Sequence, residues 1–145
     1  MSGVEFTIKL AGVNVEVRAS FFSSREYCRD YLTDEVADVD VRITKDDVAD
    51  EAAASELEYS DKYYETLAIY RKIAEALIPR NILLVHGSAV SVDGNCYLFT
   101  GPSGIGKSTH ASLWKKMLGN DTTIINDDKP LLKISNDEVE VFGSP

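Results

Sequence analysis

The chain of 145 residues is 44% hydrophobic and 27% charged, with a formal net charge of −9, a composition typical of one globular domain or of a small domain plus part of another. No apolar run approaches the roughly 20 residues that a membrane-spanning helix needs, so we expect no membrane partner. The negative charge argues against nucleic-acid binding, which depends on Lys and Arg side chains that neutralise phosphates.

The N-terminus and the cysteines bear on cellular location. The first ten residues, MSGVEFTIKL, lack both the basic segment and the continuous apolar segment of a secretory signal, so we expect a cytoplasmic protein. Cys28 and Cys96 lie far apart and match neither a C-x-x-C motif nor a zinc-ligand spacing. Both are therefore expected to be reduced packing residues rather than members of a disulfide or a metal site.

The N-terminal part predicts a small α+β region. Residues 4–10 and 13–19 alternate apolar and polar side chains on either side of an Ala-Gly pair, which predicts a hairpin. Residues 37–43 alternate in the same way and predict a third strand. A short helix is expected after the serine pair at 23–24, which is placed to cap it. Residues 46–58 have helical propensity but little apolar surface, so we expect this segment to be mobile.

Residues 61–78 give the firmest helical pattern of this part. The side chains that recur at four- and three-residue steps, and so share one predicted helical face, are Tyr63, Leu67, Tyr70, Ala74 and Leu77. Asp61 is placed to cap the first turn, and Pro79 marks the end of the helix. We interpret the aromatic stripe as core packing rather than as a surface for base stacking.

After Pro79 the pattern changes to strands. Residues 82–92, ILLVHGSAVSV, are a near-continuous apolar run that predicts a buried strand. Asp93-Gly94 predicts a tight hairpin turn, and residues 95–100 predict a second strand that leads directly into a glycine-rich loop. Later strands are predicted at 122–126, 130–134 and 139–142.

The helix after the loop is expected to bury Ala111, Leu113, Trp114 and Leu118 and to end at Gly119. The loop before it contains Gly101, Gly106, Lys107 and Ser108, which fit G-x-x-x-x-G-K-[ST] between a strand and a helix. The glycines let successive backbone N–H groups converge on phosphate oxygens at the start of the helix. We expect Lys107 to reach the β- and γ-phosphates, and Ser108 to complete a magnesium shell. The predicted nucleotide-binding residues are Gly101, Ser103, Gly104, Ile105, Gly106, Lys107, Ser108 and Thr109.

A phosphate loop needs a carboxylate that holds metal or takes a proton, and the sequence IINDD ends in two. Asp127 and Asp128 follow a predicted buried strand, which is where open α/β sheets place their ligands. Adjacent carboxylates point to different sides of an extended chain, so one could face the metal while the other addresses an acceptor hydroxyl. The alternative is that Asn-Asp-Asp only forms a turn.

His86 interrupts the apolar run, and on its own it would be read as a core histidine. The combination of HGSAV, GPSGIGKSTH and INDDKP, however, resembles the C-terminal domain of HPr kinase/phosphorylase, and more closely the HPr-kinase-like proteins of anaerobic bacteria. These motifs lie within residues 85–130. That family resembles phosphoenolpyruvate carboxykinase in its nucleotide-binding core, where strands also precede the phosphate loop.

The resemblance implies roles for individual residues. His86 matches the histidine of the family's H-G motif near the active site, and Lys107 matches its Walker lysine. Asp127 and Asp128 match its acidic pair, of which one aspartate is proposed as base for a serine hydroxyl and as acid in phosphorolysis. The chain departs from the family at Thr109, where HPr kinases commonly carry an acidic residue, and this weakens the assignment of HPr itself as substrate.

We therefore predict an α/β protein with an N-terminal α+β accessory region at 1–80 and a P-loop, carboxykinase-like core with a mixed sheet at 81–145. The expected function is an ATP- and Mg²⁺-dependent kinase with His86, Lys107, Asp127 and Asp128 in catalysis and with Ser108 and the two aspartates on the metal. The acceptor is expected to be a serine of a protein or peptide. Two alternatives stay open, a small-molecule kinase and a nucleotide-binding sensor or scaffold without phosphoryl transfer.

The final residues carry one more expectation. Only one helix follows the loop, although a doubly covered α/β sheet needs helices on both faces. By the resemblance, the family's chains continue beyond this point, so we interpret the sequence as truncated after the nucleotide-binding core. Self-association into a homo-oligomer, or the helix at 61–78, would then cover the exposed apolar surface.

Overall fold

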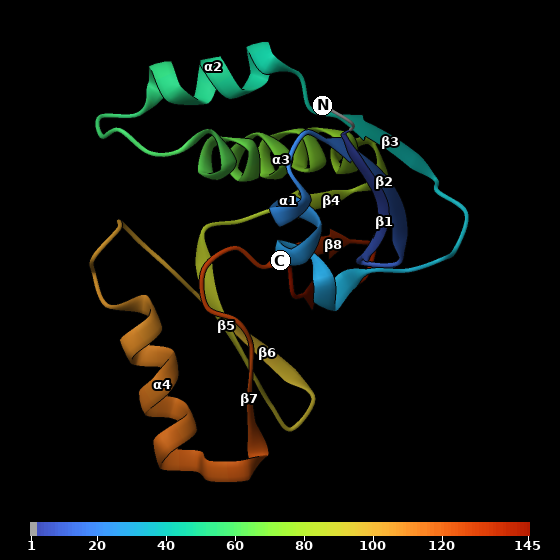
Figure 1. Cartoon of the computed structure of the whole chain (residues 1–145). Helices are drawn as coiled ribbons and strands as arrows, with labels where there is room; N and C mark the ends of the chain where they lie inside the picture. Colours follow the sequence, from blue (N-terminus) through green and yellow to red (C-terminus); the bar gives the residue numbers. More distant parts are fainter. Residues whose placement is uncertain (1–2) are drawn as a thin grey trace. The chain divides into compact units, whose positions relative to one another are not determined.

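The computed structural model describes residues 3–145 and shows a mixed α/β fold with three small sheets and four α-helices (Figure 1). The strands are β1 (Val4–Leu10), β2 (Val13–Ala19), β3 (Val39–Arg42), β4 (Ile82–Leu84), β5 (Gly87–Val92), β6 (Asn95–Thr100), β7 (Thr122–Asn126), β8 (Leu131–Ile134) and β9 (Val139–Phe142). The helices are α1 (Phe22–Tyr27), α2 (Lys45–Ala54), α3 (Asp61–Leu77) and α4 (Lys107–Leu118). None of the helices within residues 3–145 has the length and apolar character that crossing a membrane requires.

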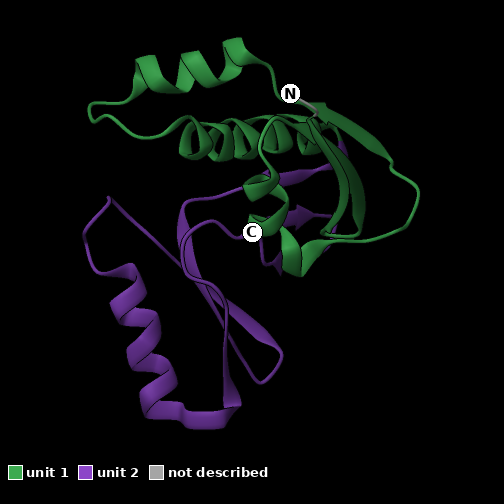
Figure 2. Ribbon diagram, in the orientation of Figure 1, with its two compact units in different colours: residues 1–79, 145 green, residues 80–144 purple. Residues whose placement is uncertain are grey.

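The chain forms two compact units (Figure 2). Met1–Pro79 together with Pro145 make the first, which we call the N-terminal unit. Arg80–Ser144 make the second, the C-terminal unit. Each unit has its own sheet or sheets, so each is described by itself.

The N-terminal unit is built on the sheet β1-β2-β3. β1 and β2 form the predicted antiparallel hairpin, which is confirmed from Val4 opposite Ala19 to Leu10 opposite Val13. Ala11 and Gly12 make the turn with positive φ values of 49° and 82°, as a two-residue hairpin turn requires. β3 is shorter than the predicted strand and runs parallel to β2.

The helix α3 packs against β2 and β3, but not with the face that the sequence predicts (Figure 1). Its buried residues are Tyr64, Glu65, Ala68, Ile69, Ile73 and Leu77. Of the predicted face only Leu77 is buried, whereas Tyr63 is 45% exposed and Leu67, Tyr70 and Ala74 are half-buried next to the buried residues. A period of 3.6 residues fits both rows of side chains, and the row with the aliphatic Ile69 and Ile73 is the one that packs in the core.

Two helix starts depend on polar side chains. α2 begins with a capping box, in which the Thr44 hydroxyl accepts a hydrogen bond from Asp47 N (3.2 Å) and the Asp47 carboxylate accepts one from Thr44 N (2.8 Å). α3 begins after Ser60, whose hydroxyl accepts from Tyr63 N (3.4 Å). The cap is therefore Ser60 and not Asp61, because Asp61 already has the helical conformation of the first turn.

The buried carboxylate of Glu65 holds the start of α1. It accepts hydrogen bonds from Ser20 N (2.8 Å), Phe21 N (3.0 Å) and the Ser24 hydroxyl (2.6 Å). The prediction that serines 23–24 cap this helix is wrong, since Phe21 precedes it without a side-chain cap and Ser24 lies inside it. Satisfying two backbone N–H groups with one carboxylate from α3 replaces the missing cap.

The segment predicted to be helical and mobile forms α2, whose contacts with α3 are largely ionic. Arg71 Nε lies 2.8 Å from Glu51 Oε1, and Lys72 Nζ lies 2.7 Å from Asp47 Oδ2. The small apolar surface of α2 is thus compensated by charged groups of α3 that the local sequence does not reveal.

In the C-terminal unit, β5 is the central strand of the sheet β6-β5-β7, and α4 packs on this sheet. The second sheet has the order β4-β8-β9. All four strand pairs of these two sheets are antiparallel, so the mixed sheet predicted for the core is wrong. β6 and β7 run in the same direction, but β5 lies between them, and each therefore pairs with an antiparallel neighbour.

The predicted strand at 82–92 is interrupted. β4 and β5 belong to different sheets, and the break falls at Val85 and His86. Val85 N donates to Pro130 O (3.1 Å), and Gly87 N donates to Asp128 O (2.9 Å). These two hydrogen bonds connect the chain on either side of His86 to the segment that follows β7, so His86 lies between β4 and β5 and in neither strand.

The apolar side chains of α4 are less buried than predicted. Ala111 is buried, but Leu113 and Leu118 are 49% and 47% exposed. Among the described residues Cys28 and Cys96 are free cysteines, as predicted. Cys28 is buried, which raises the pKa of its thiol to about 12, whereas Cys96 is exposed on β6 and is not the packing residue that we expected.

Candidate functional site

The glycine-rich loop connects the end of β6 at Thr100 to the start of α4 at Lys107. Gly104 and Gly106 have φ values of 78° and 98°, and a Cβ at either position would meet no atom within 4 Å. Glycine is therefore required by the left-handed backbone and not by lack of space. Gly106 is also the residue before α4, and no side chain caps this helix, so the backbone N–H groups of its first turn face the loop.

The Lys107 side chain is buried and folds back across the loop. Its Nζ donates to Gly101 O (2.9 Å) and to Pro102 O (3.1 Å). Both acceptors are neutral carbonyl groups, and within residues 3–145 no carboxylate forms an ion pair with this ammonium. A phosphate oxygen could replace either carbonyl with a charge-assisted hydrogen bond.

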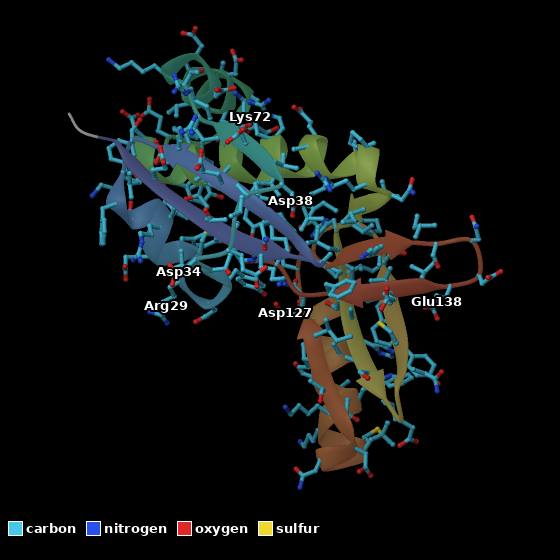
Figure 3. The ribbon with its side chains drawn as sticks, turned by 90° about the vertical axis from the view of Figure 1, so that its right-hand side faces the viewer. Arg29, Asp34, Asp38, Lys72, Asp127 and Glu138 are labelled. Carbon is cyan, nitrogen blue, oxygen red and sulfur yellow. The ribbon has the colours of Figure 1, made fainter. Side chains whose placement is uncertain are left out.

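Ser108 connects α4 to the end of β7. Its hydroxyl donates to Asp127 O (3.1 Å), and the Ser88 hydroxyl of β5 donates to the same oxygen (3.0 Å). Two hydroxyls on one carbonyl fix the point at which the chain leaves the sheet. Asp127, labelled in Figure 3, directly follows β7. Among residues 3–145 its carboxylate has no hydrogen-bond or ion-pair partner.

Asp128 lies in a turn that Asn126 organises. The Asn126 side-chain oxygen accepts from Asp128 N (2.9 Å) and Lys129 N (2.7 Å). The Asp128 carboxylate lies 3.4 Å from His86 Nε2 and 3.5 Å from Lys129 Nζ. The turn considered as an alternative for Asn-Asp-Asp is thus present, and it directs Asp128 toward the histidine.

These groups surround one open cavity of about 370 Å³. The lining residues are His86, Ser103, Gly104, Gly106, Lys107, Ser108, Thr109, Asp127 and Asp128. Of the residues assigned to the site from the sequence, Gly101 and Ile105 do not line it. Gly101 contributes its carbonyl to Lys107, and Ile105 is 65% exposed.

The sequence analysis missed three residues that hold the site. Ser88 fixes the Asp127 carbonyl, and Asn126 fixes the turn. Ser144 accepts from Asn126 Nδ2 through its carbonyl (3.1 Å), while its hydroxyl donates to Lys129 O (2.5 Å). Asn126 carried a local signal, because Asn often bonds to the backbone two residues later, but the other two contacts depend on strand register.

The oxygen atoms at the cavity suit a magnesium ion. No group of three or more His, Cys, Asp or Glu in the described part of the chain could hold a metal by itself. Magnesium, however, is usually held by one or two carboxylates together with substrate phosphates and water. The Asp127 carboxylate and the Ser108 hydroxyl, which the Asp127 carbonyl brings to the end of β7, supply oxygen ligands of that kind.

Comparisons with protein-family models, curated proteins and solved structures give no match for this chain. The features that bear on function are therefore the loop, the two aspartates and the cavity that they share. The resemblance to HPr kinases contributes only through the motifs named above.

Proposed function

We propose that the C-terminal unit binds ATP with Mg²⁺ and transfers the γ-phosphoryl group to a hydroxyl, as an HPr-kinase-related protein with a carboxykinase-like core. One observation carries the proposal: Lys107, Ser108 and Asp127 lie on a single cavity at the end of a glycine loop whose backbone is left-handed at its glycines. The arrangement of a phosphate loop directly after an antiparallel strand supports the carboxykinase-like core.

The loop would bind the phosphates through three groups. The uncapped N–H groups at the start of α4 carry partial positive charge, and the ammonium of Lys107 adds a full charge beside them. On binding, Lys107 would exchange neutral carbonyl acceptors for phosphate oxygens, which strengthens its hydrogen bonds. Thr109 also lines the cavity and would contact a phosphate nearer the nucleoside.

Ser108 and Asp127 would hold the metal. The Ser108 hydroxyl already lies beside the backbone of Asp127, so a small rotation suffices to direct its oxygen to the cavity. Ser108 and Asp127 would thus hold a magnesium ion, which would neutralise charge on the phosphate oxygens. The free carboxylate of Asp127 balances the positive charge of the metal.

Asp128 would act as the base toward the acceptor. In the transfer, the acceptor oxygen forms a bond to the γ-phosphorus and the bond to the bridging oxygen breaks, so that ADP leaves with the electron pair. The hydroxyl proton passes to the carboxylate of Asp128, which His86 orients through its contact at 3.4 Å. Most of the rate enhancement in such a reaction comes from positioning and charge stabilisation.

The test is incubation of the protein with ATP labelled in the γ-phosphoryl group, with magnesium and a cell extract. A labelled protein that is absent with Lys107→Ala supports the proposal in full, with a protein or peptide acceptor. A labelled metabolite would change the acceptor class to a small molecule. Tight ATP binding with no labelled product would overturn the transfer step and leave a nucleotide-binding sensor.

A further inference from the structure

An aromatic cluster lies between β6 and α4, outside the cavity described above. Tyr97 and Phe99 come from β6, and His110 and Trp114 come from α4. The ring centroids lie 4.9 Å apart for Tyr97 and Trp114, 4.5 Å for Phe99 and His110, and 5.3 Å for Phe99 and Trp114. Tyr97 is 43% exposed and His110 is also exposed, so the cluster is open to solvent.

The cluster and the carboxylates lie on opposite flanks of the phosphate loop. In the sheet β6-β5-β7 the central strand separates β6, which carries the aromatic residues, from β7, which ends at the aspartates. Phe99 is two residues before Gly101, and His110 directly follows Thr109, which lines the cavity. The aromatic residues therefore come from the strand just before the loop and from the first turns of the helix just after it.

The roles proposed for Lys107, Ser108 and Asp127 set the direction of a bound nucleotide. Lys107 and Ser108 take the β- and γ-phosphates, and the γ-phosphate faces Asp127. The α-phosphate and the nucleoside must then extend away from β7, toward Thr109 and the flank of β6. We propose that the base of the nucleotide stacks on His110, backed by Phe99 and Trp114, an inference that rests on the proposed phosphate site.

The His110 ring is held in place before any ligand arrives. Trp114 Nε1 donates to His110 Nε2 (3.1 Å). Phe99 meets the same ring at an interplanar angle of 90°. A ring fixed by two neighbours loses little conformational entropy when a base stacks on it. Stacking accepts any base, so this surface favours nucleotides over inorganic phosphates without selecting one base.

The experiment compares ATP with inorganic triphosphate, both with magnesium, by calorimetry and by fluorescence. Trp114 is the only tryptophan of the chain, so its emission reports on this surface. We expect ATP to bind about tenfold more tightly than triphosphate, the size of one base–aromatic stack, and to change the emission while triphosphate does not. His110→Ala should remove the preference for ATP without changing the affinity for triphosphate, and His110→Phe should restore it.

Met117→Ala is the matched control, because Met117 lies on α4 and is 82% exposed at the other end of the helix. It should change neither affinity. Equal affinities for ATP and triphosphate in the wild type, unaffected by His110→Ala, would overturn the stacking surface and leave the phosphate loop intact. Failure of both ligands to bind would overturn the proposed function and this inference with it.

Discussion

Two lysines, one in each unit, show how differently the molecule uses a charge. Lys72 of the N-terminal unit extends from α3 to the Asp47 carboxylate (2.7 Å) and the Arg42 carbonyl (2.8 Å) (Figure 3). Lys107 of the C-terminal unit is more deeply buried, and within residues 3–145 its Nζ donates to two neutral carbonyls and to no carboxylate. The charge of Lys72 is thus compensated within the fold, whereas that of Lys107 is not.

Lys72 thus carries a structural charge, whereas the charge of Lys107 is available to a ligand. A partly buried ion pair repays the cost of removing its members from water only when each charge meets its partner. A buried ammonium without a carboxylate lacks that compensation, and such arrangements are concentrated at binding and catalytic sites. In the N-terminal unit, the ion pairs of Lys72 and Arg71 compensate for the small apolar surface of α2, whereas in the C-terminal unit Lys107 lines a cavity.

The largest expected effect comes from exchanging the two lysines for alanine. Lys107→Ala should weaken ATP binding by about a hundredfold, because it removes a charge-assisted contact to phosphate, while the midpoint of thermal unfolding stays within about 2 °C. Lys72→Ala should do the reverse, with lower stability and unchanged ATP affinity. Calorimetry and thermal unfolding of the same two variants measure both, and an equal ATP affinity in Lys107→Ala would contradict the comparison.

What could be predicted from the sequence follows the same division between local and distant contacts. The β1–β2 hairpin was predictable because alternation and the Ala-Gly turn are local signals. The glycine loop before α4 was predictable because its motif needs neighbouring residues only. The chemistry of Lys107 and Asp127 stays a prediction, but their placement at one cavity is a property of the structure.

Other features could not be predicted, for physical reasons. The break at His86 interrupts a continuous apolar run, and it is caused by backbone pairing with Asp128 and Pro130, more than 40 residues away. The C-terminal sheets are antiparallel because β5 lies between β6 and β7 and β8 lies between β4 and β9, and the local sequence does not specify this strand order. The hydrogen bond from Ser88 to the Asp127 carbonyl depends on the register of β5 against β7, so no residue near Ser88 in the sequence predicts it.

The second prediction concerns the ionic contacts of α2. Burial alone would raise the pKa of Asp47, but hydrogen bonds from Lys72 and Thr44 outweigh it and hold the pKa well below its ordinary value of 3.8. Asp47→Asn should lower the free energy of unfolding by about 2 kcal/mol at neutral pH, because Lys72 and Arg71 then have no carboxylate charge at position 47. Chemical denaturation measures the change, and Asp46→Asn, at an exposed position of the same helix turn, should cost less than about 0.5 kcal/mol.

The same carboxylate makes stability depend on pH. Since its folded pKa lies below the unfolded value, the stabilisation is present above about pH 4 and is lost as the pH falls toward the folded pKa. The wild type should therefore lose stability on acidification more steeply than Asp47→Asn. Parallel pH profiles of the two proteins would show that Asp47 is no more than a surface charge.

The third prediction divides the acidic pair of the C-terminal unit. Asp127→Asn should reduce the gain in ATP affinity that magnesium gives by about tenfold, since it removes a charged oxygen from the metal. Asp128→Asn should leave that gain unchanged and lower only the rate of phosphoryl transfer. Titrations of ATP with and without magnesium distinguish the variants, and the opposite pattern would exchange the two roles.

The smallest effect tests whether polar contacts stabilise the N-terminal unit at all. The Tyr64 hydroxyl donates to Leu57 O (3.0 Å) and accepts from Tyr59 N (2.9 Å), so it holds the segment before α3. Tyr64→Phe should cost about 1 kcal/mol of unfolding free energy, because one hydroxyl serves two backbone groups. Tyr63→Phe is the matched control at the neighbouring position, where the ring is 45% exposed and packs against Tyr59 and Tyr64, and it should be close to neutral. Denaturant unfolding of both variants measures the difference: equal costs would mean that the two hydrogen bonds of the Tyr64 hydroxyl do not stabilise the N-terminal unit.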